Sequence, residues 1–307
     1  MSGRGSMLPT PRLVESVRHL CNELKIDSAA ITGGEPMMHP DLYALMSTLS
    51  CETGIHAYTM TTNGTIPRDY DFWAQLKRAG LARVNISIPD LLEYSACKDS
   101  MGRWPVLSDN KVASVYKSQT TIMCLLKKLD IPVDVNVVVF NDYANTWNVM
   151  QKLLFLRKRG MDFRIMLLPD ILDKTSYERS IATIDKIIQA SGYKMQRANR
   201  TPFSSNGLVV YRNDDGEIYV KSTMLDLGTG TRTHEPFYLE SMCNGCRLRR
   251  RQECLEGFYG IRLEMVEDDV FVRLCLHRGD DRDVCMPIMD FFESPSFSLL
   301  KAQVNSE

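Results

Sequence analysis

The chain has 307 residues, of which 44% are hydrophobic and 24% charged, and its formal net charge is -1. A chain of this composition can bury a large core, and its near-neutral charge predicts no nucleic-acid partner and no acidic membrane surface as partner. No apolar run approaches the roughly 20 residues that span a bilayer, and the first residues lack the apolar core of a signal peptide. We therefore expect a cytoplasmic protein.

Helix and strand patterns alternate along the first two thirds of the chain. Amphipathic helices are expected at residues 11–24, 41–50, 71–79, 111–129, 147–159 and 177–191, and strands at 27–31, 55–60, 83–88, 131–140 and 162–168. This alternation predicts an α/β fold with a parallel sheet or a partial barrel. Residues 91–108 form an irregular segment in this interpretation. Cys21 lies on the apolar stripe of the first helix, which favours a buried structural thiol.

A glycine-rich turn follows the first expected strand. Gly33 and Gly34 allow a ligand to approach the backbone closely, Glu35 places a carboxylate at the turn, and Pro36 closes it. The next helix is expected to start at Asp41. Ligands of parallel α/β folds bind at the carboxyl ends of strands, where this turn would lie. By itself the turn is as consistent with an ordinary strand-to-helix connection as with a ligand site.

Near residue 196 the alternation of helix and strand patterns gives way to hairpin and loop signals and a cysteine cluster. This change predicts domains at 1–195 and 196–307. Segments 208–211 and 218–220 flank Asn-Asp-Asp-Gly and predict a hairpin, and residues 223–235 read as a loop. A second hairpin, formed by 259–263 and 270–274, would return Cys275 to the neighbourhood of Cys243, Cys246 and Cys254. Four gathered thiolates suit tetrahedral zinc or an iron–sulfur cluster, whereas Cys285 reads as structural.

Several motifs of this chain, taken in order, resemble the core of radical S-adenosylmethionine (SAM) enzymes. The motifs are Ile31-Thr-Gly-Gly-Glu-Pro36, His39-Pro-Asp-Leu42, Thr61-Thr-Asn-Gly64 and Gly80-Leu81-x-x-Val84-Asn-Ile-Ser87. The cysteine-bearing tail is similar to the auxiliary-cluster extension of the branch that includes the molybdenum-cofactor cyclisation enzyme and the peptide-maturing enzymes. The resemblance implies a partial (β/α) barrel of the radical SAM type, lacking its first strand, with a small Cys-rich β-hairpin extension at the C-terminus.

The resemblance also implies roles for individual residues. Gly33, Gly34, Glu35 and Pro36 would hold the methionine part of SAM, with Glu35 facing its amino group. Thr62, Asn63, Asn85, Ser87 and Asn136 would line the same pocket. For Ser87 and Asn136 a hydrogen-bonded polar group inside the barrel is an equal alternative. Cys243, Cys246, Cys254 and Cys275 would hold an auxiliary iron–sulfur cluster of the 4Fe-4S type, with zinc as the alternative. A flavodoxin or a ferredoxin would supply electrons.

The family motif that is missing from these residues is Cys-x3-Cys-x2-Cys. In the family its thiolates hold the four-iron cluster that chelates SAM, and no such spacing occurs in the 307 residues. Two explanations stay open: an N-terminally incomplete enzyme, which the intact glycine turns favour, or a degenerate, non-catalytic binding or partner protein on the same fold. A barrel protein whose tail binds structural zinc is a third hypothesis.

The substrate is predicted by analogy alone, as a peptide or a small molecule of the natural-product type. The chain ends without the Gly-Gly pair of the cyclisation enzyme, and Asp134 stands where that branch often has a lysine. These departures argue against synthesis of the pterin precursor. The basic run Arg247, Arg249, Arg250 and Arg251 could meet an anionic substrate, but such a run is more often a solvated face.

Overall fold

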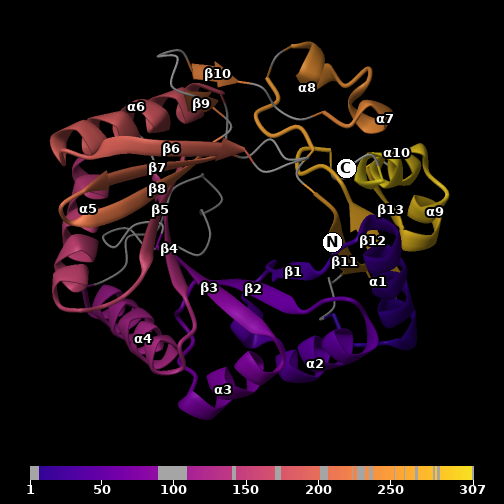
Figure 1. Cartoon of the computed structure of the whole chain (residues 1–307), viewed down its shortest axis with the longest axis horizontal. Helices are drawn as coiled ribbons and strands as arrows, with labels where there is room; N and C mark the ends of the chain where they lie inside the picture. Colours follow the sequence, from indigo (N-terminus) through magenta and orange to yellow (C-terminus); the bar gives the residue numbers. More distant parts are fainter. Residues whose placement is uncertain are drawn as a thin grey trace.

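One curved sheet forms the frame of the molecule (Figure 1). The computed structural model describes residues 7–88, 109–139, 143–169, 174–200, 207–222, 224–226, 232–234, 238–251, 253–258, 260–266, 269–278, 281 and 284–305. Eight strands of the sheet follow the order β1-β2-β3-β4-β5-β8-β7-β6. They are β1 (Ser28–Ile31), β2 (Ala57–Thr62), β3 (Leu81–Ile88), β4 (Val133–Val139), β5 (Arg164–Pro169), β6 (Lys194–Arg200), β7 (Gly207–Asn213) and β8 (Gly216–Ser222).

The strands β1 to β5 pair in parallel in chain order. This confirms the five strands expected from the sequence and the α/β partial barrel. The predicted hairpin is also present as β7 and β8, and β8 adds to β5 in parallel. Because β6 pairs only with β7 in an antiparallel ladder, β1 and β6 are the two ends of this sheet within the described residues.

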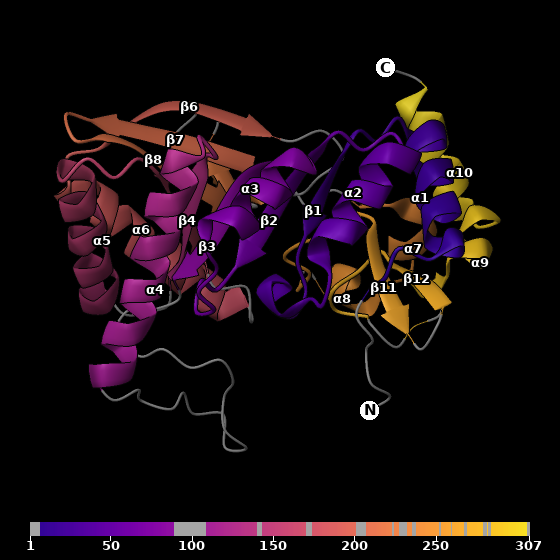
Figure 2. The ribbon, with the colours of Figure 1, turned by 90° about the horizontal axis from the view of Figure 1, so that it is seen from below.

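Helices cover the outer face of the sheet, as Figures 1 and 2 show. They are α1 (Pro11–Leu24), the 3-10 helix η1 (Pro36–Met38), α2 (Leu42–Glu52), α3 (Tyr70–Arg78), α4 (Asp109–Lys128), α5 (Tyr143–Lys158) and α6 (Lys174–Ala190). Local signals set several starts: Thr10, Asp41 and Asp69 accept hydrogen bonds from backbone N–H groups in the first turns of α1, α2 and α3. None of the described helices is long and apolar enough to cross a membrane.

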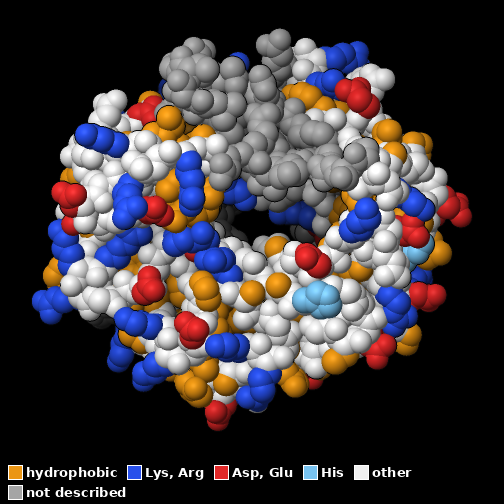
Figure 3. Space-filling model, in the orientation of Figure 1, with side chains coloured by type: hydrophobic (Ala, Val, Ile, Leu, Met, Phe, Trp, Pro, Cys, Tyr) orange, Lys and Arg blue, Asp and Glu red, His pale blue; other side chains and the backbone are white. Residues whose placement is uncertain are grey.

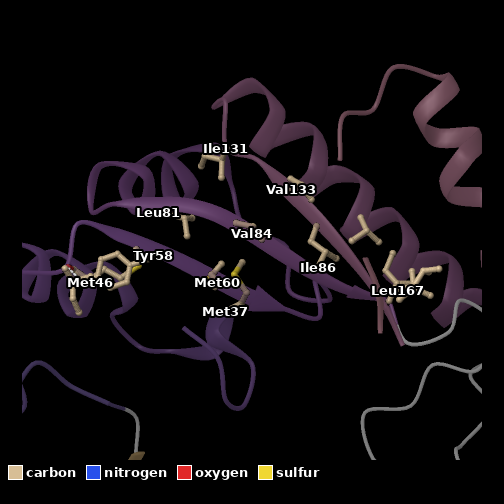
Figure 4. Packing of buried hydrophobic residues seen from close by; sticks show 14 of the residues in the cluster. Met37, Met46, Tyr58, Met60, Leu81, Val84, Ile86, Ile131, Val133 and Leu167 are labelled. Carbon is tan, nitrogen blue, oxygen red and sulfur yellow. Dashed lines mark hydrogen bonds between the residues drawn. The ribbon is translucent and has the colours of Figure 1, made fainter. Parts of the chain in front are cut away.

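The core lies between the sheet and these helices (Figure 4). Alternate residues of β2 and β3 face it: Tyr58 and Met60 on one strand, Val84 and Ile86 on the other, all at most 1% exposed. Period-two burial of this kind leaves the intervening polar residues on the inner face of the barrel. The apolar residues of each strand therefore fix its register, and with it the positions of the inward-facing polar groups.

The C-terminal part closes the ring beside α1 (Figure 1). It contains β9 (Met224–Asp226), β10 (Arg232–His234), α7 (Glu240–Cys243), α8 (Arg247–Arg250), β11 (Arg262–Val266), β12 (Asp269–Arg273), β13 (Cys285–Pro287), α9 (Ile288–Phe292) and α10 (Pro295–Val304). The second predicted hairpin is present as β11 and β12, with β13 added to its edge. His19 of α1 packs against Phe292 and Phe297, at 4.4 and 5.8 Å between ring centroids.

Two details of the sequence interpretation need correction. Residues 223–235, expected to be a loop, contain β9 and β10, which pair in an antiparallel ladder of three residues each. Strand β6 was not expected, because its residues lack an apolar alternation. The irregular segment predicted at 91–108 lies outside the described residues.

Candidate functional site

Glu35 joins the two turns that follow β1 and β2. Its Oε1 accepts hydrogen bonds from Thr62 Oγ1 at 2.5 Å and from the Met37 backbone N–H at 3.0 Å, and its Oε2 accepts one from the Asn63 N–H at 2.8 Å. A carboxylate offers about four acceptor positions, so these three bonds leave one for a ligand. The residues predicted from the two separate motifs are thus brought together by one side chain.

Open space faces the two glycines beside Glu35. A β-carbon built on Gly33 or Gly34 would meet no heavy atom of the described residues within 4 Å, and Gly33 has a φ of +125°, which disfavours other residues. The turn is anchored from behind, because Met37 is fully buried next to Met60 (Figure 4). Burial of such a side chain contributes about 1.5–3 kcal/mol. The turn is therefore fixed on its core side and accessible on the other.

Gln119 of α4 is a site residue that the sequence interpretation missed. It is 1% exposed, and its Nε2 donates to the backbone oxygen of Asn63 at 2.8 Å and to that of Ser87 at 3.4 Å. It thereby connects the carboxyl ends of β2 and β3. Its Oε1 is buried and has no hydrogen-bond partner among the described residues. One signal was available: Gln119 lies on the same helical stripe as Ile122, Met123 and Leu126.

The remaining predicted pocket residues occupy the inner face of the sheet. Asn85 donates from Nδ2 to Thr61 Oγ1 at 3.2 Å, and Ser87 is in register with Asn136 on the neighbouring strand. All three predicted residues are half-buried. Asn85 and Ser87 lie on β3 and Asn136 on β4, and Asn85 reaches the end of β2 through its bond to Thr61. Their role in a pocket stays a prediction.

The inner face borders a deep hollow at the centre of the molecule, inside which Lys or Arg side chains are visible (Figure 3).

Two arginines of this face share one carboxylate. Asp134, whose side chain is 5% exposed, accepts from Arg83 Nη1 at 2.8 Å and from Arg164 through Nε at 2.6 Å and through Nη2. The bonds with Asp134 raise the pKa of the Arg164 guanidinium. Arg164 also lies over the Tyr219 ring, 5.0 Å from its centroid.

The four predicted metal ligands lie in one region of the C-terminal part. Cys243 ends α7, Cys246 precedes α8, Cys254 lies in the following segment and Cys275 follows β12, so the hairpin does return toward the first three thiols. Burial raises the pKa of the Cys243 thiol to about 11, with further effects from the other three cysteines. Burial also raises the pKa of Cys254, whose Sγ accepts from the Gly257 N–H at 3.3 Å.

The other three thiols lie close enough to Cys243 to add to the rise that burial causes in its pKa. Among the described residues, no group of three or more His, Cys, Asp or Glu side chains is placed to hold a single metal ion. Cys285 is half-buried in β13, opposite Arg273. The buried carboxylate of Glu256 and His277 form an ion pair at 3.4 Å next to the cysteines, and this contact raises the pKa of His277.

The basic run near the cysteines is occupied by local contacts. Arg249 pairs with Glu240 at 2.8 Å and lies over the Tyr238 ring, and Arg250 donates to the backbone oxygen of Gly245. These contacts agree with the solvated-face interpretation for both residues.

The chain is similar to known proteins over the residues that carry these motifs. The family profile described as "Radical SAM superfamily" matches residues 1–142. A GTP 3′,8-cyclase of Stenotrophomonas maltophilia (strain R551-3) is 26% identical over 300 residues, which are 93% of this chain and 79% of that protein. A GTP 3′,8-cyclase of Peptoclostridium acidaminophilum is 45% identical over 76 residues, which are 24% of this chain and 23% of its own length.

A solved structure titled "Native anSMEcpe with bound AdoMet" also matches. It is 18% identical, with a TM-score of 0.38, over 59% of this chain and 50% of that one. The chain matches about half of that structure, about a quarter of the Peptoclostridium acidaminophilum cyclase and about four fifths of the Stenotrophomonas maltophilia cyclase. The motifs and the profile agree over residues 1–142, which carry the glycine turns, and over this part the chain is similar to the radical S-adenosylmethionine superfamily.

Proposed function

We propose that the chain binds SAM in the pocket of Gly33, Gly34, Glu35 and Pro36, with Thr62 and Asn63 as its second wall, and modifies a small molecule by radical chemistry. The observation that carries this proposal is the Glu35 carboxylate: it is fixed by three donors and keeps one acceptor position beside open space. An ammonium group such as that of SAM suits this position, because a charge-assisted hydrogen bond would form there.

The inner face would line the rest of the pocket. Ser87 and Asn136 are register partners on β3 and β4, and together with Asn85, two residues earlier on β3, they would meet the ligand from the sheet. Gln119 would hold the adjacent backbone. In this family an iron–sulfur cluster and SAM together supply the radical, but the Cys-x3-Cys-x2-Cys ligands of that cluster do not occur in these 307 residues. The roles proposed for this chain's own residues are therefore binding, orientation and exclusion of water. A small electron-transfer protein of the flavodoxin or ferredoxin class would supply the electron.

For the tail we propose an auxiliary iron–sulfur cluster held by Cys243, Cys246, Cys254 and Cys275. The chemistry of the donor set fits, since three buried thiols and the half-buried Cys246 come from separate segments, and burial and then the other three thiols raise the pKa of Cys243. A zinc ion with bonds of about 2.3 Å holds its sulfurs within about 4 Å of each other, whereas a [4Fe–4S] cluster separates its thiolates more widely. Zinc stays the alternative, and metal analysis distinguishes the two.

GTP is the first small molecule to test, because the relatives above are named GTP 3′,8-cyclase. The Asp134 carboxylate, which occupies the position where the branch often has a lysine, is the reason to test peptides and other small molecules alongside it.

Calorimetric titration with SAM tests the pocket. The isosteric variant Glu35→Gln should bind SAM about tenfold or more weakly, because it replaces a charged acceptor by an amide. Glu52→Gln, at an exposed carboxylate that pairs with Arg18, is the matched control and should bind normally. Equal binding by both variants would contradict the pocket assignment. Binding without methionine release under reducing conditions would favour the alternative, a non-catalytic binding protein.

Anaerobic reconstitution followed by iron, sulfide and zinc analysis tests the tail. Cys243→Ala and Cys246→Ala should lose the bound metal, whereas Cys51→Ala, at an exposed thiol of α2, should retain it. A colourless protein that contains zinc alone would overturn the cluster assignment in favour of a zinc site.

A further inference from the structure

The inner face of the barrel carries two guanidinium groups for one carboxylate. Arg83 on β3 and Arg164 on β5 both bond to Asp134 on β4, which lies between them. Within the described residues this trio leaves one positive charge uncompensated. The two arginine side chains are partly exposed, and a bound anion would balance this excess charge.

Donors as well as charge remain available in this trio. Each guanidinium has five N–H donors, and the bonds to Asp134 use one from Arg83 and two from Arg164. The Asp134 side chain is 5% exposed, whereas those of Arg83 and Arg164 are 31% and 37% exposed. The carboxylate therefore lies beneath the two guanidiniums, and their unused edges are the accessible part of the trio.

The geometry of Arg164 is fixed before any ligand arrives. Asp134 holds its Nε and Nη2 edge, and the Tyr219 ring supports its planar face, while the Tyr219 hydroxyl donates to Glu217 at 2.6 Å. A guanidinium that is already oriented loses little conformational freedom on binding. Such an arrangement favours recognition of a planar or tetrahedral oxyanion.

Two members of the trio, Asp134 and Arg164, lie in the row of the sheet that contains Thr61, next to the second glycine turn. Thr61, Asn85, Asp134 and Arg164 are register partners on four neighbouring strands, and Thr61 directly precedes the Thr62 that contacts Glu35. Three strand spacings separate the ends of this row, a distance of about 14 Å. A molecule anchored at Arg164 would thus reach across the hollow toward the proposed SAM pocket.

We propose that Arg83 and Arg164, oriented by Asp134, form a binding site for a single oxyanion group, a carboxylate or a phosphate monoester, of the small-molecule substrate. This inference rests on the proposed function for the identity of the substrate pocket. Asp134 sets the specificity: it supplies the geometry for one anionic group, and its own negative charge disfavours a polyphosphate in the same place.

Titration of the full chain with inorganic phosphate and with inorganic tripolyphosphate tests the site without any need for SAM. Arg164→Gln and Arg83→Gln should each weaken phosphate binding by about tenfold, and Arg164→Lys should weaken it less than Arg164→Gln. Arg18→Gln, at an exposed arginine of α1, is the control and should bind phosphate as the wild type does. Asp134→Asn should shift the preference toward tripolyphosphate, because it removes the opposing charge.

Phosphate binding that is unchanged in both Arg83→Gln and Arg164→Gln, or that is weakened equally by Arg18→Gln, would overturn the proposal. A wild-type preference for tripolyphosphate over phosphate would also overturn it. Calorimetric titration with SAM separates the two proposals, since the arginine variants are expected to retain SAM binding while Glu35→Gln loses it. Circular dichroism of each variant checks that the loss is not unfolding, and Arg83→Gln, which removes one bond to Asp134, provides the milder perturbation.

Discussion

The Cγ atom of Gln119 occupies the space that a β-carbon on residue 64 would need. The two positions are 2.9 Å apart, and Gly64 has a φ of +66°, so the residue is required to be glycine on two grounds. Gln119 in turn donates to the backbone oxygen of Asn63, the residue before Gly64. The Thr-Asn-Gly turn is therefore shaped by a helix that lies more than fifty residues further along the chain.

Gly64→Ala should destabilise the protein more than the backbone strain alone accounts for. A left-handed alanine costs about 1–2 kcal/mol, and the clash with Gln119 should add about 1–3 kcal/mol. Gly192 is the matched control: its φ is +68°, and a β-carbon there would meet no atom of the part of the chain that the structure describes within 4 Å. Urea unfolding of Gly64→Ala and Gly192→Ala separates the two contributions. Equal free energies of unfolding for the two variants would show that the Gln119 side chain moves aside at no cost.

The sequence predicted most of the frame because the strands β1 to β5 are apolar enough to be recognised locally. Strand β6 was missed because Lys194, Gln196 and Arg197 are exposed and its position depends on pairing with β7. The sequence of such a segment does not predict a strand, because it is as polar as that of a loop. Long-range pairing, rather than local preference, makes it a strand.

The site was predictable where motifs mark it and unpredictable where it depends on distant contacts. Glu35 and Thr62 were named from two glycine motifs, and the structure places them 2.5 Å apart. Gln119 and the arginine pair on Asp134 were not named. A lone polar residue in a helix is usually solvated, and which charges of three strands share one face depends on their register.

Thr62→Val should weaken SAM binding and lower stability together. The Thr62 side chain is buried, and its hydroxyl donates to Glu35 and accepts from the Gly64 N–H at 3.0 Å. Valine has nearly the same shape but satisfies neither group, which should cost about 1–3 kcal/mol of unfolding free energy. The measurements are urea unfolding and calorimetric titration with SAM. Thr121→Val, at an exposed threonine of α4, is the control; a loss as large in this variant would contradict a specific role for Thr62.

The metal-free chain should lose stability in alkaline solution through Cys243. An unfolded thiol has a pKa near 9, and burial raises that of folded Cys243 to about 11. Below pH 9 both states keep the proton, so stability is unaffected. Above pH 9 the unfolded state releases its proton first, so the free energy of unfolding falls until about pH 11, by roughly 3 kcal/mol at most.

Urea unfolding of the metal-free chain between pH 7.5 and 10.5 measures this loss. Cys243→Ser should show a shallower dependence on pH than the wild type, whereas Cys51→Ser, at an exposed thiol, should reproduce the wild-type slope. Parallel curves for wild type and Cys243→Ser would mean that this thiol does not titrate differently in the folded and unfolded states.

Phe297→Ala should loosen the contact by which the C-terminal part closes on α1. Phe297 is 6% exposed, lies 5.3 Å from both Phe291 and Phe292 between ring centroids, and faces His19 of α1. Truncation of a buried phenylalanine costs about 3–5 kcal/mol, since it removes apolar burial and leaves a cavity. Leu299 lies on the same helix but is 40% exposed, so Leu299→Ala should cost less than about 1 kcal/mol. Urea unfolding measures both variants, and hydrogen exchange of α1 and α10 should accelerate in Phe297→Ala alone. Unchanged exchange in α1 would mean that the aromatic contact does not hold the two parts together.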